Sequence, residues 1–320
     1  MRALSGIQPS GALHIGNYLA ALKQYIALQD QHEGFYFLAD YHALTTIRDP
    51  DVMRRYTMSA AIDFLACGLD PERSVLFKQS DVPEVTELTW LLSCVTPMGL
   101  LERCHAYKEK VADGASAEHG LFAYPVLMAA DILIYDSDIV PVGQDQKQHV
   151  EVTRDIAARF NNTFGETLKL PEPHIVPSVA TVPGLDGRKM SKSYGNTIEI
   201  FADEETTRKR VMSIVTDSTP LEAPKDPDKC NVMALYRLFA SDEEVKEMEE
   251  RYRAGGYGYG DAKKELARVI NEYFRPMRER RPQLEREPDY VRDVLSQGAR
   301  RARSQAQETL ARARAAAGYV

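Results

Sequence analysis

Two lysines and two serines lie within five residues in K-M-S-K-S, residues 189–193 of the stretch L-D-G-R-K-M-S-K-S-Y-G-N. Gly, Asp and Asn favour turns, because they supply positive φ or local side-chain hydrogen bonds, so a plain surface turn is one interpretation. Ammonium groups beside loop N–H donors are also the groups that bind phosphate oxygens. The segment therefore predicts either a turn or a mobile clamp for a polyphosphate.

A second candidate for phosphate binding is the segment H-I-G-N, residues 14–17. Gly16 follows a short strand candidate at the point where a helix begins, and a glycine there lets a nucleotide approach the backbone. His14 can bring an imidazole to the same phosphates. Alone the motif is weak, because a surface histidine near a glycine is common.

Hydrophobic periodicity predicts the framework that must position these motifs. The apolar runs A-L-S-G-I, F-Y-F-L-A-D and S-V-L-F-K-Q-S are strand candidates. Between the first two runs, Ile15, Leu19, Leu22 and Ile26 recur at the spacing of one helical face. This alternation of strands and helices is typical of parallel βαβ units.

The remainder of the chain predicts a second, helical part. Helix candidates fill a less regular middle, residues 82–138, and the strand-helix pattern then returns with D-I-V-P-V-G-Q-D-Q. Beyond about Phe201 strand signals fade and helical patterns follow one another. We therefore predict an α/β fold: a Rossmann-like parallel-sheet catalytic domain over 1–200, with 82–138 as an inserted helical segment, and a C-terminal all-helical domain over 201–320.

Composition narrows the class of protein. The chain has 320 residues, 44% hydrophobic and 27% charged, which is typical of two globular domains or one large one. It contains no apolar run of about 18 residues and no signal-peptide pattern, so we expect a cytoplasmic protein without a membrane anchor. Cys67, Cys94, Cys104 and Cys230 lie far apart, which predicts free, mostly buried thiols rather than a metal site.

Charge is unevenly distributed along the chain. The net charge is −7, but the segment from Arg275 to the end has 11 Arg, no Lys and 6 acidic residues, so it carries +5 and the rest −12. A basic surface that meets phosphate would explain this asymmetry, and so would a solvated helix face.

The order of the two motifs, H-x-G-x after the first strand and K-M-S-K-S after the last, resembles the class I aminoacyl-tRNA synthetases. Further text narrows the resemblance to the bacterial tryptophanyl-tRNA synthetases over essentially the whole chain: S-G-I-Q-P-S-G-A-L-H-I-G-N-Y, L-L-E-R-C-H-A-Y-K-E-K, Y-P-V-L-M-A-A-D-I-L-I-Y and V-P-V-G-Q-D-Q-K-Q-H. The resemblance implies activation of L-tryptophan with ATP to tryptophanyl-adenylate and pyrophosphate, followed by transfer to the 3′-terminal adenosine of tRNA-Trp. The sequence departs from the common pattern after K-M-S-K-S, where Y-G-N-T replaces Asp, Pro and Asn.

The resemblance implies a tryptophan-binding set centred on Asp131. Its carboxylate would accept a hydrogen bond from the indole N–H, and phenylalanine would leave that carboxylate unpaired. Met128 and Tyr124 share its helical face. The other members are His42, Val142 and Gln146, of which Gln146 would orient the α-amino and carboxylate groups. Without the resemblance, Asp131 serves equally well as a local cap or ion pair, and its helical neighbours as core.

The resemblance also implies an ATP-binding set. The tryptophan carboxylate attacks the α-phosphorus, and the leaving pyrophosphate gathers negative charge that Lys189, Lys192 and Lys110 would neutralise. Gln8 and His14 complete the catalytic set, and no general base is needed. Mg²⁺ would be held mainly by ATP oxygens and water, with no protein metal site. The full ATP-binding set is Gln8, Pro9, Ser10, Gly16, Asn17, Gly143, Gln144, Asp145, Val182, Lys189, Met190, Ser191, Lys192 and Ser193.

The implied macromolecular partners are tRNA-Trp and a second copy of the chain. The inserted segment 82–138 would form the interface of a homodimer, and the basic helical domain, near Arg275–Arg281, would contact the anticodon stem. Other interpretations stay open: a tyrosine–tRNA ligase of the same fold, or an inactive relative that binds tRNA or a protein. A nucleotidylyltransferase shares the H-x-G-x logic but would lack the long basic tail.

Overall fold

The computed structural model describes residues 1–104, 118–143, 147–175 and 182–319. The chain forms two compact units: unit 1 contains residues 1–11, 23–177 and 284–320, and unit 2 contains residues 12–22 and 178–283.

Unit 1 is built on a five-stranded sheet in the order β3-β2-β1-β4-β5, with every pairing parallel. Its strands are β1 Arg2–Ile7, β2 Glu33–Leu38, β3 Ser74–Lys78, β4 Ile139–Val142 and β5 Glu172–Ile175. The predicted Rossmann-like α/β class is confirmed, because parallel strands in this order are joined by helical crossovers.

Both faces of the sheet are covered, as the apolar runs predicted. On β2, Phe35 and Phe37 belong to the large apolar core beside helices α5 (Glu84–Ser93), α8 (His119–Leu133) and α9 (Lys147–Phe164), whereas Tyr36 points to the opposite face. There the Tyr36 ring stacks on Tyr25, which in turn stacks on Phe64 of helix α4 (Pro50–Ala66). A continuous apolar run is therefore required in each central strand.

Strand β5 is the one described strand that the sequence pattern did not predict. It has four residues, E-P-H-I, and Pro173 pairs with Val140 of β4. Proline lacks a backbone N–H and is tolerated at sheet edges, which is where β5 lies. So short a strand with a central proline leaves little periodic signal.

Unit 1 contains most of the helices that surround the sheet. They are α2 Lys23–Leu28, α3 Asp40–Ala43, α4 Pro50–Ala66, α5 Glu84–Ser93, α6 Met98–Leu101, α8 His119–Leu133, α9 Lys147–Phe164 and α14 Pro288–Ala316. Helix α4 begins where the sequence favours it, because Asp49 accepts hydrogen bonds from the N–H groups of Asp51 and Val52 at 2.8 and 3.0 Å.

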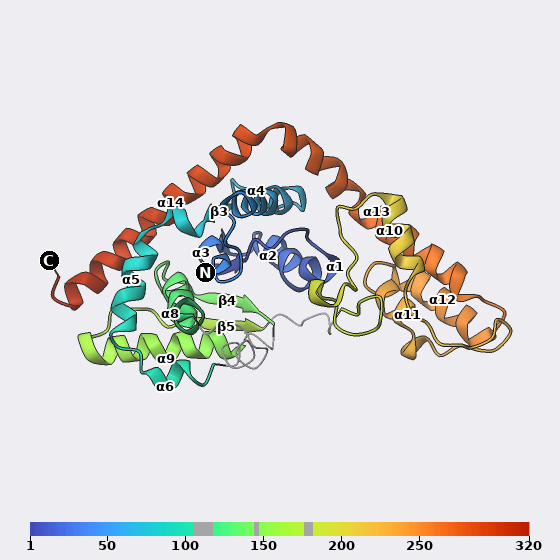
Figure 1. The fold of residues 1–320 in the computed structure, drawn as a ribbon, viewed down its shortest axis with the longest axis horizontal. Coiled ribbons are helices and arrows are strands. Elements are labelled where there is room, and N and C mark those ends of the chain that lie inside the picture. Colours follow the sequence, from blue (N-terminus) through green and yellow to red (C-terminus); the bar gives the residue numbers. More distant parts are fainter. Residues whose placement is uncertain (105–117, 144–146, 176–181, 320) are drawn as a thin grey trace. The chain divides into compact units, whose positions relative to one another are not determined.

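The C-terminal helix α14 packs on the α/β unit, alongside β3 and α5 (Figure 1). Gly298 lies so close to the edge strand β3 that a Cβ atom built on it would be 1.9 Å from the Leu76 carbonyl oxygen. Glu84 of α5 accepts hydrogen bonds from Arg303 at 2.7 Å and Gln307 at 2.9 Å. The compact units thus differ from the predicted division at residue 200, because α14 covers the sheet edge.

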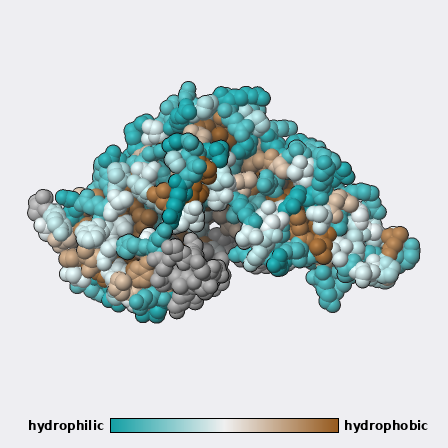
Figure 2. Space-filling model, in the orientation of Figure 1, coloured by the Kyte–Doolittle hydropathy of each residue, from teal (hydrophilic) through white to brown (hydrophobic). Residues whose placement is uncertain are grey.

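Unit 2 is largely helical. Its main elements are α1 Ile15–Asn17, a π-helical turn Tyr18–Leu22, α10 Glu204–Met212, α11 Asn231–Tyr236, α12 Asp242–Ala254 and α13 Tyr259–Arg286, whose last residues belong to unit 1. Hydrophilic residues predominate over α10 to α13 in Figure 2, with smaller hydrophobic groups between them. The helical pattern near the C-terminus forms two helices, because Glu287 is not helical and Pro288 begins α14.

The cysteines, the hydropathy of the helices and the possible metal ligands can be compared with the sequence. Of the four free cysteines, Cys67, Cys104 and Cys230 are buried and Cys94 is exposed, so mostly buried thiols were a correct prediction. No helix among the described residues has the length and hydropathy needed to cross a membrane. Within that same part of the chain, no group of three His, Cys, Asp or Glu side chains is placed to hold a metal ion.

Candidate functional site

The buried carboxylate of Asp131 is the centre of a hydrogen-bonded cluster in unit 1. It lies on α8, is 1% exposed, and both of its oxygens accept hydrogen bonds of 2.8 Å from Gln79 Nε2. His42 Nε2 lies 2.9 Å from Asp131 Oδ2. These partners are 52 and 89 residues away along the chain, so Asp131 does not act as a local helix cap.

Burial and hydrogen bonding shift the pKa of this carboxyl group in opposite directions. Removal from water raises the pKa of Asp131 above its ordinary value, because the charged form loses solvation. The hydrogen bonds from His42 and Gln79 favour the charged form and oppose that rise. A carboxylate oxygen pair offers about four lone-pair positions, so the three hydrogen bonds leave room for one more donor.

The side-chain amide of Gln79 is oriented by a hydrogen bond from the backbone. Its Oε1 accepts a hydrogen bond of 3.1 Å from the backbone N–H of Tyr41, which directs Nε2 toward Asp131. Gln79 was missed by the sequence analysis. Its signal was its place directly after strand β3, since polar residues at the carboxyl ends of parallel strands line ligand sites.

A pocket of about 730 Å³ lies beside this cluster within unit 1, and His42 and Tyr124 line it. The Tyr124 ring packs edge-on against His42, with centroids 6.2 Å apart, and against His149 of α9 at 6.3 Å. The structure therefore brings the predicted residues His42 and Tyr124 to one pocket wall, and Asp131 is hydrogen-bonded to His42 without lining the pocket itself. His149 is a further residue that sequence analysis missed.

The other predicted tryptophan-binding residues lie in the same unit. Met128, half-buried, is on α8 one turn before Asp131 and packs against the apolar core. Val142 ends strand β4, and Gly143 follows it at the carboxyl edge of the sheet. Gln146 lies outside the described residues, as do Gln144, Asp145 and Lys110.

The K-M-S-K-S segment lies in unit 2 on a loop held by backbone and amide hydrogen bonds. Met190 is buried and donates its N–H to the Val182 carbonyl at 2.9 Å, while Lys189, Lys192 and Ser193 are exposed. Buried Asn196 accepts from the Ser191 N–H at 2.8 Å. The segment is thus an exposed lysine-bearing loop on a buried support.

Asn196 also joins the two ends of this loop. Its amide donates to the Lys189 carbonyl at 3.1 Å and to the Asp186 carboxylate at 2.7 Å. Gly195, at φ 63°, closes the short helical turn Lys192–Tyr194. The hydroxyls of Ser191 and Ser193 are hydrogen-bonded to each other at 2.8 Å.

The H-I-G-N segment contacts this loop, also within unit 2. A Cβ atom built on Gly16 would lie 3.0 Å from the His14 ring and 3.5 Å from Met190 Cβ, so only glycine fits comfortably there. The Ile15 N–H donates to the Ile198 carbonyl at 2.9 Å, just beyond the lysine loop. Two motifs separated by about 170 residues in the sequence are therefore neighbours.

His14 is a neutral cap in this arrangement. Its Nδ1 accepts a hydrogen bond of 3.3 Å from the Asn17 N–H, and burial, followed by the positive charge of Lys192, lowers the pKa of His14 to about 4. At neutral pH the imidazole is therefore uncharged.

The remaining predicted ATP-binding residues of unit 1 follow strand β1. Gln8 Nε2 donates to the Thr46 hydroxyl at 3.2 Å, Pro9 is buried and Ser10 is exposed. Gly11 has φ 87° and lies against the Tyr56 ring, so the chain turns there at a conformation that favours glycine.

Comparison with known proteins identifies relatives over the full chain. Residues 1–275 match the family model described as tRNA synthetases class I (W and Y). A tryptophan–tRNA ligase of Rhodopirellula baltica is 59% identical over 314 residues, covering 98% of each chain. The corresponding ligase of Fusobacterium nucleatum is 56% identical over 320 residues, covering 100% of this chain and 98% of the relative.

A solved structure agrees with these relatives. The tryptophanyl-tRNA synthetase of Campylobacter jejuni, crystallised as a complex with ADP and tryptophan, has a TM-score of 0.93 and 51% identity and covers 99% of this chain and 100% of its own. The described fold therefore matches that of a protein whose structure holds an adenine nucleotide and tryptophan.

Proposed function

Since this chain belongs to the class I tRNA synthetases of the tryptophan and tyrosine group, we propose that it is a tryptophan–tRNA ligase. It activates L-tryptophan with ATP, forming tryptophanyl-adenylate and pyrophosphate, and then transfers the tryptophanyl group to the 3′-terminal adenosine of tRNA-Trp. The family model includes tyrosine enzymes, but relatives at 59% and 56% identity are tryptophan ligases.

The observation that carries the choice of tryptophan is the buried Asp131 carboxylate. With Gln79 and His42 already bound to it, the carboxylate has one position left for the single N–H of an indole ring. Phenylalanine has no donor and would leave this buried group short of a partner, which sites of this kind exploit for specificity. In this proposal Tyr124 and Met128, which lie on the same helix, pack on the ring.

The activation step needs positive charge rather than a base. The ionised tryptophan carboxylate attacks the α-phosphorus; a carboxylate O–P bond forms and the bond from that phosphorus to pyrophosphate breaks. The exposed Lys189 and Lys192 neutralise the charge that develops on pyrophosphate. His14 is neutral because its pKa is low, so it adds no charge of its own and donates one N–H hydrogen bond to the phosphate oxygens.

The rest of the ATP set follows the same proposal. Gln8, Pro9 and Ser10 follow β1, and Gly143 follows β4, so both segments lie at the carboxyl edge of the sheet, where nucleotides bind in such folds. Lys110 supplies a third cation. Mg²⁺ is bound through ATP oxygens and water, because phosphate oxygens are its preferred ligands.

The protein works as a homodimer in the cytoplasm, with tRNA bound by its basic helices. Trp90 is 68% exposed and Met98 63% exposed in the segment 82–138, and an apolar surface of this kind favours association. On α13, Arg275 and Arg280 are exposed and suit tRNA phosphates. Arg278 differs, because it donates to the Ile200 carbonyl at 2.7 Å and supports the fold.

The decisive experiment is amino-acid-dependent exchange of pyrophosphate into ATP, with tryptophan, tyrosine and phenylalanine compared. We expect exchange with tryptophan alone. Asp131→Ala should raise the KM for tryptophan at least tenfold or abolish exchange, whereas Asp155→Ala, on an exposed position of α9, should leave it unchanged. Exchange driven by tyrosine, or by none of the three amino acids, would contradict the assignment.

A further inference from the structure

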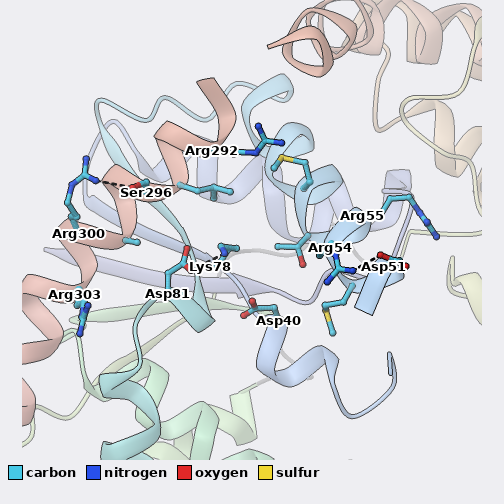
Figure 3. A pocket seen from close by; sticks show the side chains of 15 residues that line it. Asp40, Asp51, Arg54, Arg55, Lys78, Asp81, Arg292, Ser296, Arg300 and Arg303 are labelled. Atoms are coloured by element: carbon cyan, nitrogen blue, oxygen red, sulfur yellow. Dashed lines mark hydrogen bonds and ion pairs between the residues drawn. The ribbon is translucent and has the colours of Figure 1, made fainter. Parts of the chain in front are cut away.

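A second pocket in unit 1, of about 1000 Å³, lies between α4 and the C-terminal helix α14, at the end of strand β3. Figure 3 shows Arg54 and Arg55 on α4, and Arg292, Arg300 and Arg303 on α14. We name it the α4–α14 groove. Its lining residues are Asp40, Asp51, Met53, Arg54, Arg55, Thr57, Met58, Lys78, Asp81, Arg292, Leu295, Ser296, Ala299, Arg300 and Arg303.

The lining of the groove is basic, whereas the protein as a whole is acidic. Six lining residues are Lys or Arg and three are Asp, a local balance of +3 in a chain with net charge −7. A basic surface on an acidic protein concentrates binding of polyanions at one place, because the rest of the molecule repels them.

Arg55 and Arg300 are available to a ligand, whereas Arg303 is paired with Glu84 of α5. Among the described residues, neither Arg55 nor Arg300 forms an ion pair: Arg55 lies over the Tyr56 ring, and Arg300 donates to Ser296 at 2.9 Å. Arg54 pairs with Asp51 at 2.5 Å, but both side chains are mostly exposed, and exposed pairs are worth little. A phosphate can therefore replace those partners at small cost.

Size and spacing favour a polymer over one small anion. A volume of about 1000 Å³ lies at the upper end of small-molecule pockets. Arg292 and Arg300 are eight residues apart on α14, a rise of about 12 Å along the helix. That length spans several phosphates of a nucleic-acid strand.

The position of the groove points to the same conclusion. Asp40, at the beginning of α3, lines the groove, and His42, on the same short helix, lines the pocket beside Asp131. Both pockets are thus lined in part by the short helix α3, which follows β2. A nucleic-acid strand bound in the groove would therefore lie next to the amino-acid site.

We propose that the α4–α14 groove binds the phosphate backbone of tRNA. This inference rests on the proposed function, which makes tRNA the substrate, and it adds a surface to the amino-acid and nucleotide sites. Arg55 and Arg300 make the principal phosphate contacts, and Leu295 with Ala299 forms the apolar floor under the ribose.

The test measures tRNA-Trp binding by the full chain at several salt concentrations, using Arg55→Ala and Arg300→Ala. Each variant should raise the Kd about three- to tenfold and lower the slope of log K against log salt by about one. Arg159→Ala, an exposed arginine on α9 of the same unit, is the matched control and should stay within twofold of wild type. Variants that behave like this control would overturn the proposal.

A second readout separates this proposal from the enzyme assignment. Tryptophan-dependent pyrophosphate exchange needs no tRNA, so Arg55→Ala and Arg300→Ala should retain it at the wild-type rate. Loss of exchange in the wild-type protein would count against the ligase assignment alone, while tRNA binding would still decide the role of the groove. Lower affinity for inorganic tripolyphosphate with unchanged tRNA binding would also overturn the proposal, since the groove would then bind a small anion.

Discussion

At the scale of single residues, the tryptophan site depends on a carboxylate that water does not reach. Burial disfavours the charged form of Asp131, and its hydrogen bonds favour that form. Gln79 donates to both oxygens of the carboxylate. Sequence reasoning selected the carboxylate from its family motif but not this supporting amide, because the partner comes from a different element.

We predict that Gln79→Ala raises the KM for tryptophan about tenfold while the KM for ATP stays within twofold. A hydrogen bond to a charged group contributes about 1.5–3 kcal/mol, and its loss leaves Asp131 less ionised and less well oriented. Pyrophosphate exchange under varied tryptophan and varied ATP measures both constants.

The control for this variant is Gln29→Ala, which removes a half-buried glutamine that bonds to Gly68 and Asp70 in the same unit. It should reduce stability without changing either KM. Equal KM changes in the two variants would mean that Gln79 acts on the fold alone.

His14 predicts a dependence of stability on pH. The pKa of folded His14 is lowered to about 4, whereas the unfolded side chain titrates near 6.5, so the unfolded chain binds the proton first as pH falls. The free energy of unfolding of wild type should therefore decrease between pH 6.5 and 4 more than that of His14→Asn, which retains a capping side chain. Urea unfolding at several pH values measures the difference, and parallel curves would contradict the low pKa.

At the scale of elements, the last helix is held against the sheet by a close backbone approach. Gly298 of α14 faces the Leu76 carbonyl of the edge strand, and ion pairs of Arg312 with Asp136 and of Arg303 with Glu84 fix the same helix. These C-terminal arginines are thus neutralised by carboxylates within unit 1. A helix laid along an edge strand also protects it from pairing with other chains.

We predict that Gly298→Ala lowers the free energy of unfolding by about 1–3 kcal/mol, because the new methyl group would overlap backbone atoms that cannot move aside. Gly260→Ala in α13 is the matched change, since nothing lies within 4 Å of its Cβ position. It should be neutral or stabilising by up to about 1 kcal/mol. Urea midpoints compare the two, and equal midpoints would refute the close contact.

At the scale of the whole molecule, an exposed aromatic side chain belongs to the surface that the proposed homodimer would bury. Trp90 is the sole tryptophan of the chain and is 68% exposed on α5. So large an exposed apolar side chain is typical of a surface that a partner covers, and the proposed partner is a second copy.

We predict that Trp90→Glu converts a dimer into monomers in size-exclusion chromatography with light scattering. Val215→Glu, a comparable change at an exposed valine of unit 2, should leave the dimer intact. Dilution of wild type should shift the Trp90 fluorescence to longer wavelength as the indole becomes hydrated. A monomeric wild-type protein would exclude this interface.

The sequence by itself determined the parallel α/β class and four of the five described strands, because apolar periodicity is a local property, and it selected the segments H-I-G-N and K-M-S-K-S as candidates for phosphate binding. Only the tertiary structure decided that Gln79 and His42 bind Asp131, that Gly16 meets Met190, and that α14 returns to the sheet. Those pairs join residues 52 to 222 positions apart, and no local pattern encodes such contacts. Their geometry depends on how the β-strands and helices pack, which is decided by burial summed over the whole fold.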